Sequence, residues 1–134
     1  MFWKFTMFTI GKLAKLTSSS VETIRYYQRI GLLRVPETVK SYRYYSQQDV
    51  ETLQFIQRAK DAGLQLNEIK ELLQLQLDDR DKVRQVIEHR LEKITQRIAE
   101  LGALKHRLNS WLIECKSSEQ ACCPILQNLK QASS

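Results

Sequence analysis

A single row of aliphatic residues in the C-terminal half of the chain constrains its fold most strongly. These residues recur at alternating spacings of four and three over nearly four heptads, interrupted once at Lys105: Ile87, Leu91, Ile94, Ile98, Leu101, Leu108 and Leu112. That spacing predicts a helix of about 30 residues with one apolar seam. The rest of so short a chain is too small to cover the seam, so the pattern predicts a homodimer paired along this helix.

The composition fits a small helical protein. The chain has 134 residues with 4 Gly and 2 Pro, which favours long helices and few turns. No apolar run approaches the roughly 20 residues that span a bilayer. The start MFWKFTMF lacks a small-residue cleavage site and does not read as a signal peptide. Three cysteines without a secretion signal therefore indicate reduced thiols and a cytoplasmic location.

The charge is concentrated in the N-terminal half. Residues 1–62 hold 10 Lys and Arg against 5 Asp and Glu, whereas residues 63–134 hold 11 against 10. This excess predicts a polyanionic partner for the N-terminal half, although a merely soluble basic face would give the same count. The sequence has no nucleophile–His–carboxylate set, phosphate loop or metalloprotease motif. We therefore expect a binding protein and not an enzyme.

Two short helices are predicted near the N-terminus. Thr9 is placed to cap a helix over residues 10–17, whose apolar side comprises Ile10, Leu13, Ala14 and Leu16. The hydroxyls of TSSS break this helix and offer a cap for a second helix over residues 21–30, which Gly31 ends. Only three or four residues separate the two helices, as in a helix-turn-helix.

A short hairpin and two further helices should follow. The β-branched and aromatic stretch predicts Leu33–Val35 paired with Tyr42–Tyr44. Ser46 is placed to cap a third helix that ends at Gly63, with Asp49 near its N-terminus. Its expected apolar side comprises Val50, Leu53, Phe55, Ile56 and Ala59. A fourth helix is expected over residues 66–77.

The linked segments VETIRYYQRIGLL and YRYYSQQDVETLQFIQRAKDAGLQLNEIKELL resemble the MerR family of bacterial transcription regulators. The resemblance runs from Phe8 to about Leu129, nearly the whole chain. It implies a mainly α fold with a winged helix-turn-helix DNA-binding domain, a long antiparallel coiled-coil dimerisation helix and a short C-terminal metal-binding loop and helix. The expected boundaries are 1–6 for an N-terminal extension before an alternative start at Met7, 7–76 for the DNA-binding domain, 77–113 for the dimerisation helix and 114–134 for a cysteine-containing effector-binding tail.

The second helix would then lie in the major groove of promoter DNA, with the hairpin as a wing beside it. The side chains that we expect to reach bases or phosphates are Ser19, Ser20, Thr23, Arg25, Tyr26, Tyr42, Arg43, Tyr44, Arg58 and Lys60. Arg25 and Arg43 are the principal expected contacts. Tyr27 is equally explained as a core residue, and either Tyr44 or Tyr45 by packing of the wing.

All three cysteines lie in the segment ECKSSEQACCPIL. Cys115 is expected to end the long helix, and Pro124 is well placed to begin a short one. Cys123 would then sit at that helix N-terminus, whose partial positive charge favours a thiolate. Two facing thiolates form a soft metal site. The candidate metal ligands are therefore Cys115 and Cys123, with Cys122 as a third ligand or a bystander.

The spacing from Cys115 to Cys123 resembles that of copper-efflux regulators of the family, which implies a two-coordinate Cu(I) or Ag(I) site. Family members that sense mercury, zinc, cadmium or lead usually add a partner cysteine at the start of the dimer helix, and the corresponding segment LDDRDKV has none. A divalent ion (Zn, Cd, Pb, Hg or Co) remains an alternative, with Cys122 or one of Asp78, Asp79 and Asp81 as a further ligand. A redox or electrophile signal is another alternative.

The resemblance also implies how a signal would act. In this family the dimer stays on a promoter whose spacer is too long, and metal binding makes it bend and untwist the DNA so that RNA polymerase can engage. This predicts a metal-responsive activator acting by promoter distortion. A thiol metal buffer with incidental basicity is the alternative from a different functional class.

Overall fold

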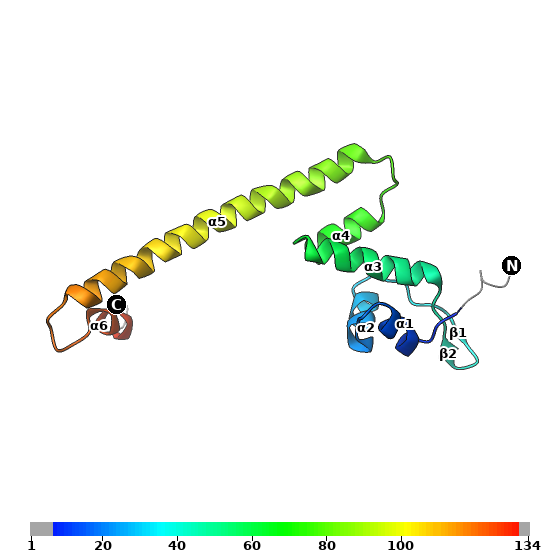
Figure 1. Cartoon of the computed structure of the whole chain (residues 1–134), viewed down its shortest axis with the longest axis horizontal. Coiled ribbons are helices and arrows are strands. Elements are labelled where there is room, and N and C mark those ends of the chain that lie inside the picture. Colours follow the sequence, from blue (N-terminus) through cyan, green and yellow to red (C-terminus); the bar gives the residue numbers. More distant parts are fainter. Residues whose placement is uncertain (1–6, 132–134) are drawn as a thin grey trace. The chain divides into compact units, whose positions relative to one another are not determined.

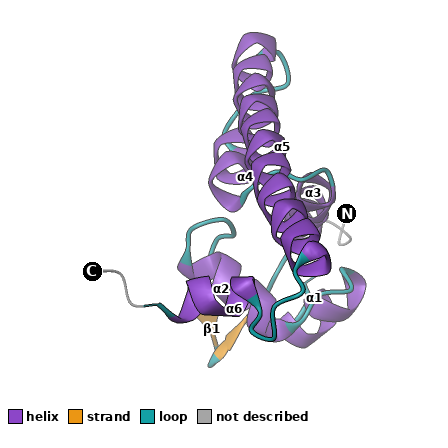
Figure 2. Ribbon diagram, turned by 90° about the vertical axis from the view of Figure 1, so that its left-hand side faces the viewer, coloured by secondary structure: helices purple, strands orange, loops and turns teal. Residues whose placement is uncertain are grey.

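The computed structural model describes residues 7–131, which form six helices and one hairpin (Figures 1 and 2). In chain order the elements are α1 (Ile10–Leu16), α2 (Val21–Arg29), β1 (Thr38–Val39), β2 (Tyr42–Arg43), α3 (Gln47–Asp61), α4 (Leu66–Leu73), α5 (Arg80–Ser117) and α6 (Pro124–Lys130). The predicted mainly α fold is thereby confirmed. None of the helices within the described range is both long and apolar enough to cross a membrane.

The chain divides into two units, the first ending at Val86 and the second beginning at Ile87. In the first unit α1 packs on α2 and α3, and α3 packs on α4. Their shared core is aliphatic with two tyrosines: Leu13, Ala14, Ile24, Tyr27, Leu32, Leu33, Tyr45, Val50, Leu53, Ile56, Ala59 and Ile69. Burial of these side chains from four helices and two connections fixes α2 against its neighbours.

The helix starts follow from side-chain caps. Thr9 Oγ1 accepts the Lys12 N–H at 3.3 Å, and Ser20 Oγ accepts the Thr23 N–H at 3.0 Å. At the start of α3 the Ser46 N–H donates to Asp49 Oδ2 at 2.8 Å. Each bond satisfies a backbone donor that the helix leaves free. The predicted caps Thr9 and Ser46 are confirmed, and Ser20 is the hydroxyl of TSSS that caps α2.

The hairpin differs from the prediction, since Leu33–Val35 is not a strand. Its register is Thr38 opposite Arg43 and Val39 opposite Tyr42. Gly31 turns the chain at φ +83°, after which the Leu32 and Leu33 N–H groups both donate to the Tyr27 carbonyl at 2.8 and 3.2 Å. These donors cap the end of α2 and are unavailable for strand pairing.

The hairpin turn lies at Lys40 and Ser41, both in the left-handed region with φ 50° and 72°. Two consecutive positive φ values characterise the two-residue turn that matches the twist of paired strands. The strands of the wing are therefore shorter than expected, and both directly adjoin the turn.

Three further expectations require correction. Leu16 and Phe55 are 44% and 39% exposed, because the apolar sides of α1 and α3 are narrower than predicted. Helix α4 ends at Leu73, and α5 continues to Ser117, so Cys115 lies within its last turn and does not end it.

Candidate nucleic-acid interface and metal centre

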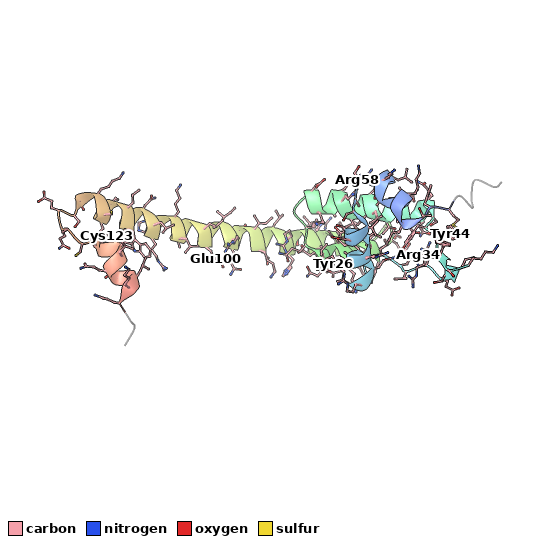
Figure 3. All side chains as sticks on the ribbon, turned by 90° about the horizontal axis from the view of Figure 1, so that it is seen from below. Tyr26, Arg34, Tyr44, Arg58, Glu100 and Cys123 are labelled. Atoms are coloured by element: carbon pink, nitrogen blue, oxygen red, sulfur yellow. The ribbon has the colours of Figure 1, made fainter. Side chains whose placement is uncertain are left out.

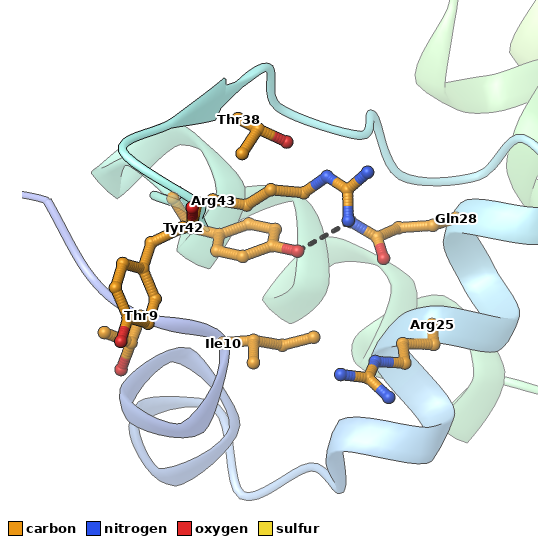
Figure 4. Close-up of a pocket in the computed structure, with 9 residues that line it drawn as sticks. Thr9, Ile10, Arg25, Gln28, Thr38, Tyr42 and Arg43 are labelled. Atoms are coloured by element: carbon orange, nitrogen blue, oxygen red, sulfur yellow. Dashed lines mark hydrogen bonds between the residues drawn. The ribbon is translucent and has the colours of Figure 1, made fainter.

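Arg25 of α2 and Arg43 of β2 line one cavity of about 330 Å³ between α2 and the hairpin (Figure 4). The start of α1, a further residue of α2, the hairpin and the chain just after it complete its wall: Thr9, Ile10, Gln28, Thr38, Ser41, Tyr42 and Tyr45. Two guanidinium groups beside an open cavity form a local positive site suited to an anion such as a phosphate. The structure thus brings together Arg25, Tyr42 and Arg43 from the set expected to face DNA.

Gln28 is a residue of this site that the sequence analysis missed. Its side-chain amide donates to the Tyr45 hydroxyl at 2.9 Å, drawn as the dashed line in Figure 4. The same nitrogen donates to the Arg34 carbonyl at 3.2 Å. The amide therefore ties α2 to the chain on both sides of the hairpin. Its position on the same helix as Arg25, three residues further on, was the available signal.

Arg34 was also missed. Its guanidinium makes a two-point ion pair with Asp49, with Nε 2.9 Å from Oδ1 and Nη2 2.7 Å from Oδ2. The Asp49 side chain is only 3% exposed, whereas that of Arg34 is 52% exposed. The sequence alone places Asp49 only near the N-terminus of α3. Nothing in the local sequence indicates its partner in the α2–β1 connection.

The hydroxyls at the start of α2 have partners within the protein. Ser20 Oγ donates to Thr23 Oγ1 at 2.9 Å, and Ser19 Oγ accepts from the Gln57 side chain at 2.8 Å. Gln57 also donates to the Thr17 carbonyl, which joins α3 to the turn between α1 and α2. These bonds fix the N-terminus of α2, where the expected DNA-facing hydroxyls lie.

The remaining expected DNA residues lie on exposed or half-buried positions, and Figure 3 labels three of them: Tyr26, Tyr44 and Arg58. Tyr26 is 43% exposed, with the Arg29 guanidinium 5.7 Å from its ring centre. Arg58 is exposed on α3. Lys60 Nζ lies 3.4 Å from the Tyr27 hydroxyl and 5.9 Å from the ring centre. Tyr27 and Tyr45 are both buried core residues.

The second unit brings two of the three cysteines together. Cys123 is the N-cap residue of α6, which Pro124 begins (Figure 3). The backbone N–H groups of Leu126 and Ile125, followed by a hydrogen bond from the Cys115 side chain, lower the pKa of the Cys123 thiol. Burial and the charge of Glu114 oppose this shift. Each donor stabilises a thiolate, which is the form that binds metal.

Cys122 does not share this arrangement. Cys115 and Cys122 are both exposed and Cys123 is half-buried, and all three are free thiols. Among residues 7–131 no group of three or more His, Cys, Asp or Glu side chains is placed to hold a metal ion. The cysteine chemistry that the structure places together is therefore the Cys115–Cys123 pair.

Comparison with known proteins identifies the family of the chain. Residues 8–76 match the family described as MerR HTH family regulatory protein, and residues 50–111 match the family described as MerR, DNA binding. The chain is 39% identical over 127 residues to the mercuric resistance operon regulatory protein of Bacillus cereus, covering 91% of this chain and 96% of that one. It is 34% identical over 125 residues to the HTH-type transcriptional regulator CueR of Vibrio cholerae, covering 90% of each.

Solved structures give the same relationship. The transcription regulator PbrR691 from Ralstonia metallidurans, in complex with lead(II), superposes with a TM-score of 0.80 at 29% identity, covering 92% of this chain and 99% of that one. The regulator MerR from Bacillus megaterium, in complex with mercury(II), gives a TM-score of 0.66 at 31% identity, covering 90% and 96%. These relatives are transcription regulators and not enzymes. The chain belongs to the MerR family of helix-turn-helix regulatory proteins.

Proposed function

We propose that this chain is a metal-responsive transcription activator. In this proposal it binds promoter DNA as a homodimer and senses a soft metal ion through Cys115 and Cys123. The observation that carries the metal assignment is the placement of these two thiols, Cys115 in the last turn of α5 and Cys123 at the N-cap of α6, with the Cys115 side chain among the groups that lower the pKa of Cys123. Two sulfur donors on helix ends fit a soft ion, because thiolates prefer such ions and helices hold them at a fixed separation.

The DNA assignment has separate support in the first unit. Helix α2, the wing and the arginine pair of the cavity occupy the N-terminal half, where the excess of positive charge lies. A recognition helix with an arginine-bearing wing is suited to reading the major groove while contacting backbone phosphates. Because the family is one of DNA-binding regulatory proteins, we propose promoter DNA as one partner and RNA polymerase as the other.

Activation in this proposal is a change in DNA shape and not a change in occupancy. Bending and untwisting a promoter costs several kcal/mol, so the protein state that favours the distorted DNA must be stabilised by its effector. A metal ion bridging Cys115 and Cys123 would fix α6 to the end of α5. The dimer formed along the α5 seam would carry that constraint to both copies of the DNA-binding unit.

Cu(I) or Ag(I) is the ion we favour. Two-thiolate coordination suits monovalent soft ions, and Cys122 is exposed outside the pair. The relatives support a second candidate, a divalent ion such as mercury(II) or lead(II), because one is named for mercuric resistance and others were solved with these ions. Cys122 would then be a third ligand.

Metal competition on the purified, reduced full-length chain tests the assignment. Cu(I) should be withdrawn from a chromophoric chelator by the unmodified chain and by Cys122→Ser, but not by Cys115→Ser or Cys123→Ser. Retention of mercury(II) or lead(II) that depends equally on all three cysteines would replace the copper assignment with the divalent one. A gel shift on the chain's own upstream DNA separates a regulator from a thiol buffer, since a buffer would retain no palindromic site at modest salt.

A further inference from the structure

One cluster of side chains joins the wing to both helices beside it. Its Gln28 and Tyr45 line the cavity between Arg25 and Arg43, whereas its Arg34 and Asp49 lie outside that cavity. The cluster begins at Asp49, near the start of α3, whose buried carboxylate accepts two bonds from Arg34 and one from the Ser46 N–H. Arg34 lies between α2 and β1, so this ion pair fixes the chain that enters the hairpin to α3.

Gln28 extends the cluster to α2. Its side-chain amide donates to the Arg34 carbonyl and to the Tyr45 hydroxyl. Tyr45 leaves the hairpin and is 2% exposed, and its backbone pairs with Phe8 through N–H to O distances of 2.7 and 2.8 Å. One amide therefore holds the chain entering the wing and the chain leaving it. The hairpin itself has only two paired residues on each strand, too few to set its own orientation.

Arg34 and Arg43 line different cavities. Arg34 lines a recess of about 240 Å³ with Leu32, Leu33, Gln48, Asp49, Thr52 and Leu73. Arg25 and Arg43 line the 330 Å³ cavity, of which Arg34 is not a part. Two of the nitrogens of Arg34 are committed to Asp49, which restrains the guanidinium on the α3 side.

We infer that Arg34 is a positioning residue for DNA binding. It acts through Asp49 and Gln28 to hold the wing so that Arg43 stands opposite Arg25. It does not contact DNA itself. This inference rests on the proposed DNA-binding function and deepens it, because it assigns part of the operator affinity to a cation remote from the phosphates. Without the ion pair the wing is more mobile. Ordering the wing when DNA binds then costs conformational entropy, which lowers the affinity.

A double-mutant cycle separates positioning from direct contact. Arg34→Gln, Arg43→Ala and the double variant are compared in the full-length chain. The probe is a duplex selected by the unmodified chain from a random-sequence pool. Arg34→Gln alone should weaken binding about tenfold, but in the Arg43→Ala background by less than about twofold, because the arginine it positions is already absent. The matched control is Arg84→Gln, which removes an exposed arginine 3.8 Å from Asp81 on α5 and should leave affinity unchanged.

Salt dependence and rescue give the second readout. Arg34→Gln should leave the slope of log affinity against log salt unchanged, whereas a lost phosphate contact lowers it by about one. Arg34→Lys keeps the charge but cannot reproduce the two-point pair, so its affinity should fall between those of the unmodified chain and Arg34→Gln. Additive losses in the cycle together with a reduced slope would make Arg34 a direct phosphate contact and overturn the inference.

Amide hydrogen exchange of the DNA-free chain tests the cluster without any operator. Arg34→Gln should speed exchange at the strand positions of the wing, residues 38–43, while α2 and α3 keep their protection. If amide exchange at residues 38–43 is unchanged in Arg34→Gln, the inference is contradicted, whether or not the chain binds a duplex. An unmodified chain that retains no duplex contradicts the proposed function instead. If Arg34→Gln loses the circular dichroism signal of its helices, the DNA-binding and exchange tests are both made with Arg34→Lys. The expected changes then have the same direction.

Discussion

Cys115 lies in the last turn of α5 and Cys123 is the N-cap residue of α6, and the side chain of Cys115 is one of the groups that lower the pKa of the Cys123 thiol. The segment between them reverses the chain and includes Cys122, which remains exposed. One thiol is held by a long helix and the other by a cap position that Pro124 makes rigid. Both thiols are therefore held at the end of a helix, whereas Cys122 lies in the connection between α5 and α6.

The first prediction concerns the metal response of the three cysteines. Cys115→Ser and Cys123→Ser should abolish metal-induced transcription, because each removes one of the two paired sulfur donors. Operator binding should persist, since these residues lie outside the unit that carries α2 and the wing. Cys122→Ser is the matched control and should retain induction by Cu(I). The measurements are reporter transcription and gel shift with each variant, and equal loss in all three would indicate a three-thiolate site.

The second prediction concerns pH. The pKa of Cys123 is lowered in the folded chain, first by the Leu126 and Ile125 N–H groups and then by Cys115. The pH midpoint for its alkylation by iodoacetamide should therefore be lower in the folded protein than in urea, because the thiolate is the nucleophile. Thiolate formation stabilises the folded tail above the unfolded pKa, and this contribution is lost as pH falls through the folded pKa.

Cys115→Ala, which removes the thiol without putting a hydroxyl donor in its place, supplies the control for the pH measurement. It should raise the folded midpoint only in part, since the two backbone donors remain. Peptide mapping by mass spectrometry assigns the alkylated cysteine. Identical midpoints in folded and unfolded protein would show that the α6 N-terminus does not stabilise the thiolate.

Local features of this fold were predictable from the sequence, and contacts between distant segments were not. Thr9, Ser46 and the glycine that ends α2 act within a few residues, so their side-chain chemistry was sufficient to place the helix boundaries. The predicted strand at Leu33 was wrong because the contacts that Leu33 makes in the folded core outweigh its propensity for a strand. Its side chain is 3% exposed in the core and its N–H caps α2.

The candidate sites show the same division. The spacing of Cys115 and Cys123 with Pro124 was enough to expect a facing pair, because both lie next to helix ends. The Arg34–Asp49 ion pair joins residues 15 apart across the hairpin, and Gln28 reaches Tyr45 over 17 residues. No periodicity relates such positions, so only the folded structure identifies these partners.

The third prediction concerns the wing arginine. Arg43→Ala should weaken operator binding by roughly 1–3 kcal/mol and lower the salt slope by about one, if it makes a charged phosphate contact of ordinary strength. Arg84→Ala, an exposed arginine of α5 outside the cavity, serves as the control. The measurement is fluorescence anisotropy over a salt series. Unchanged affinity of Arg43→Ala across the series would remove Arg43 from the interface.

The fourth prediction compares two glycines of the first unit. Gly31 has φ +83°, and a Cβ there would lie 3.0 Å from Lys70 Nζ. Gly31→Ala should lower the free energy of unfolding by about 1 kcal/mol or more, chiefly from the strained backbone. Gly11 lies in α1, and a Cβ there meets nothing within 4 Å. Gly11→Ala should therefore raise the free energy of unfolding by up to about 1 kcal/mol. Urea unfolding followed by circular dichroism measures both, and changes of the same sign would contradict this explanation.

The fifth prediction concerns the seam of α5. Its aliphatic side chains are 38–65% exposed in the single chain: Ile87, Leu91, Ile94, Ile98, Leu101, Leu108 and Leu112. Since a second copy paired along the seam would bury them, the chain should be a dimer at micromolar concentration without metal or DNA. Ile94→Lys or Leu101→Lys places an unpaired charge in that seam and should yield monomers.

Gln96→Lys is the matched control for the dimer, because it adds the same charge two residues from Ile94 on the opposite side of α5. Its ammonium group would be placed to pair with Glu100, which Gln96 already contacts at 3.3 Å. It should therefore remain dimeric. Sedimentation velocity gives the mass of each form. A monomeric mass for the unmodified chain, or equal dissociation of Ile94→Lys and Gln96→Lys, would show that the seam is not the dimer interface.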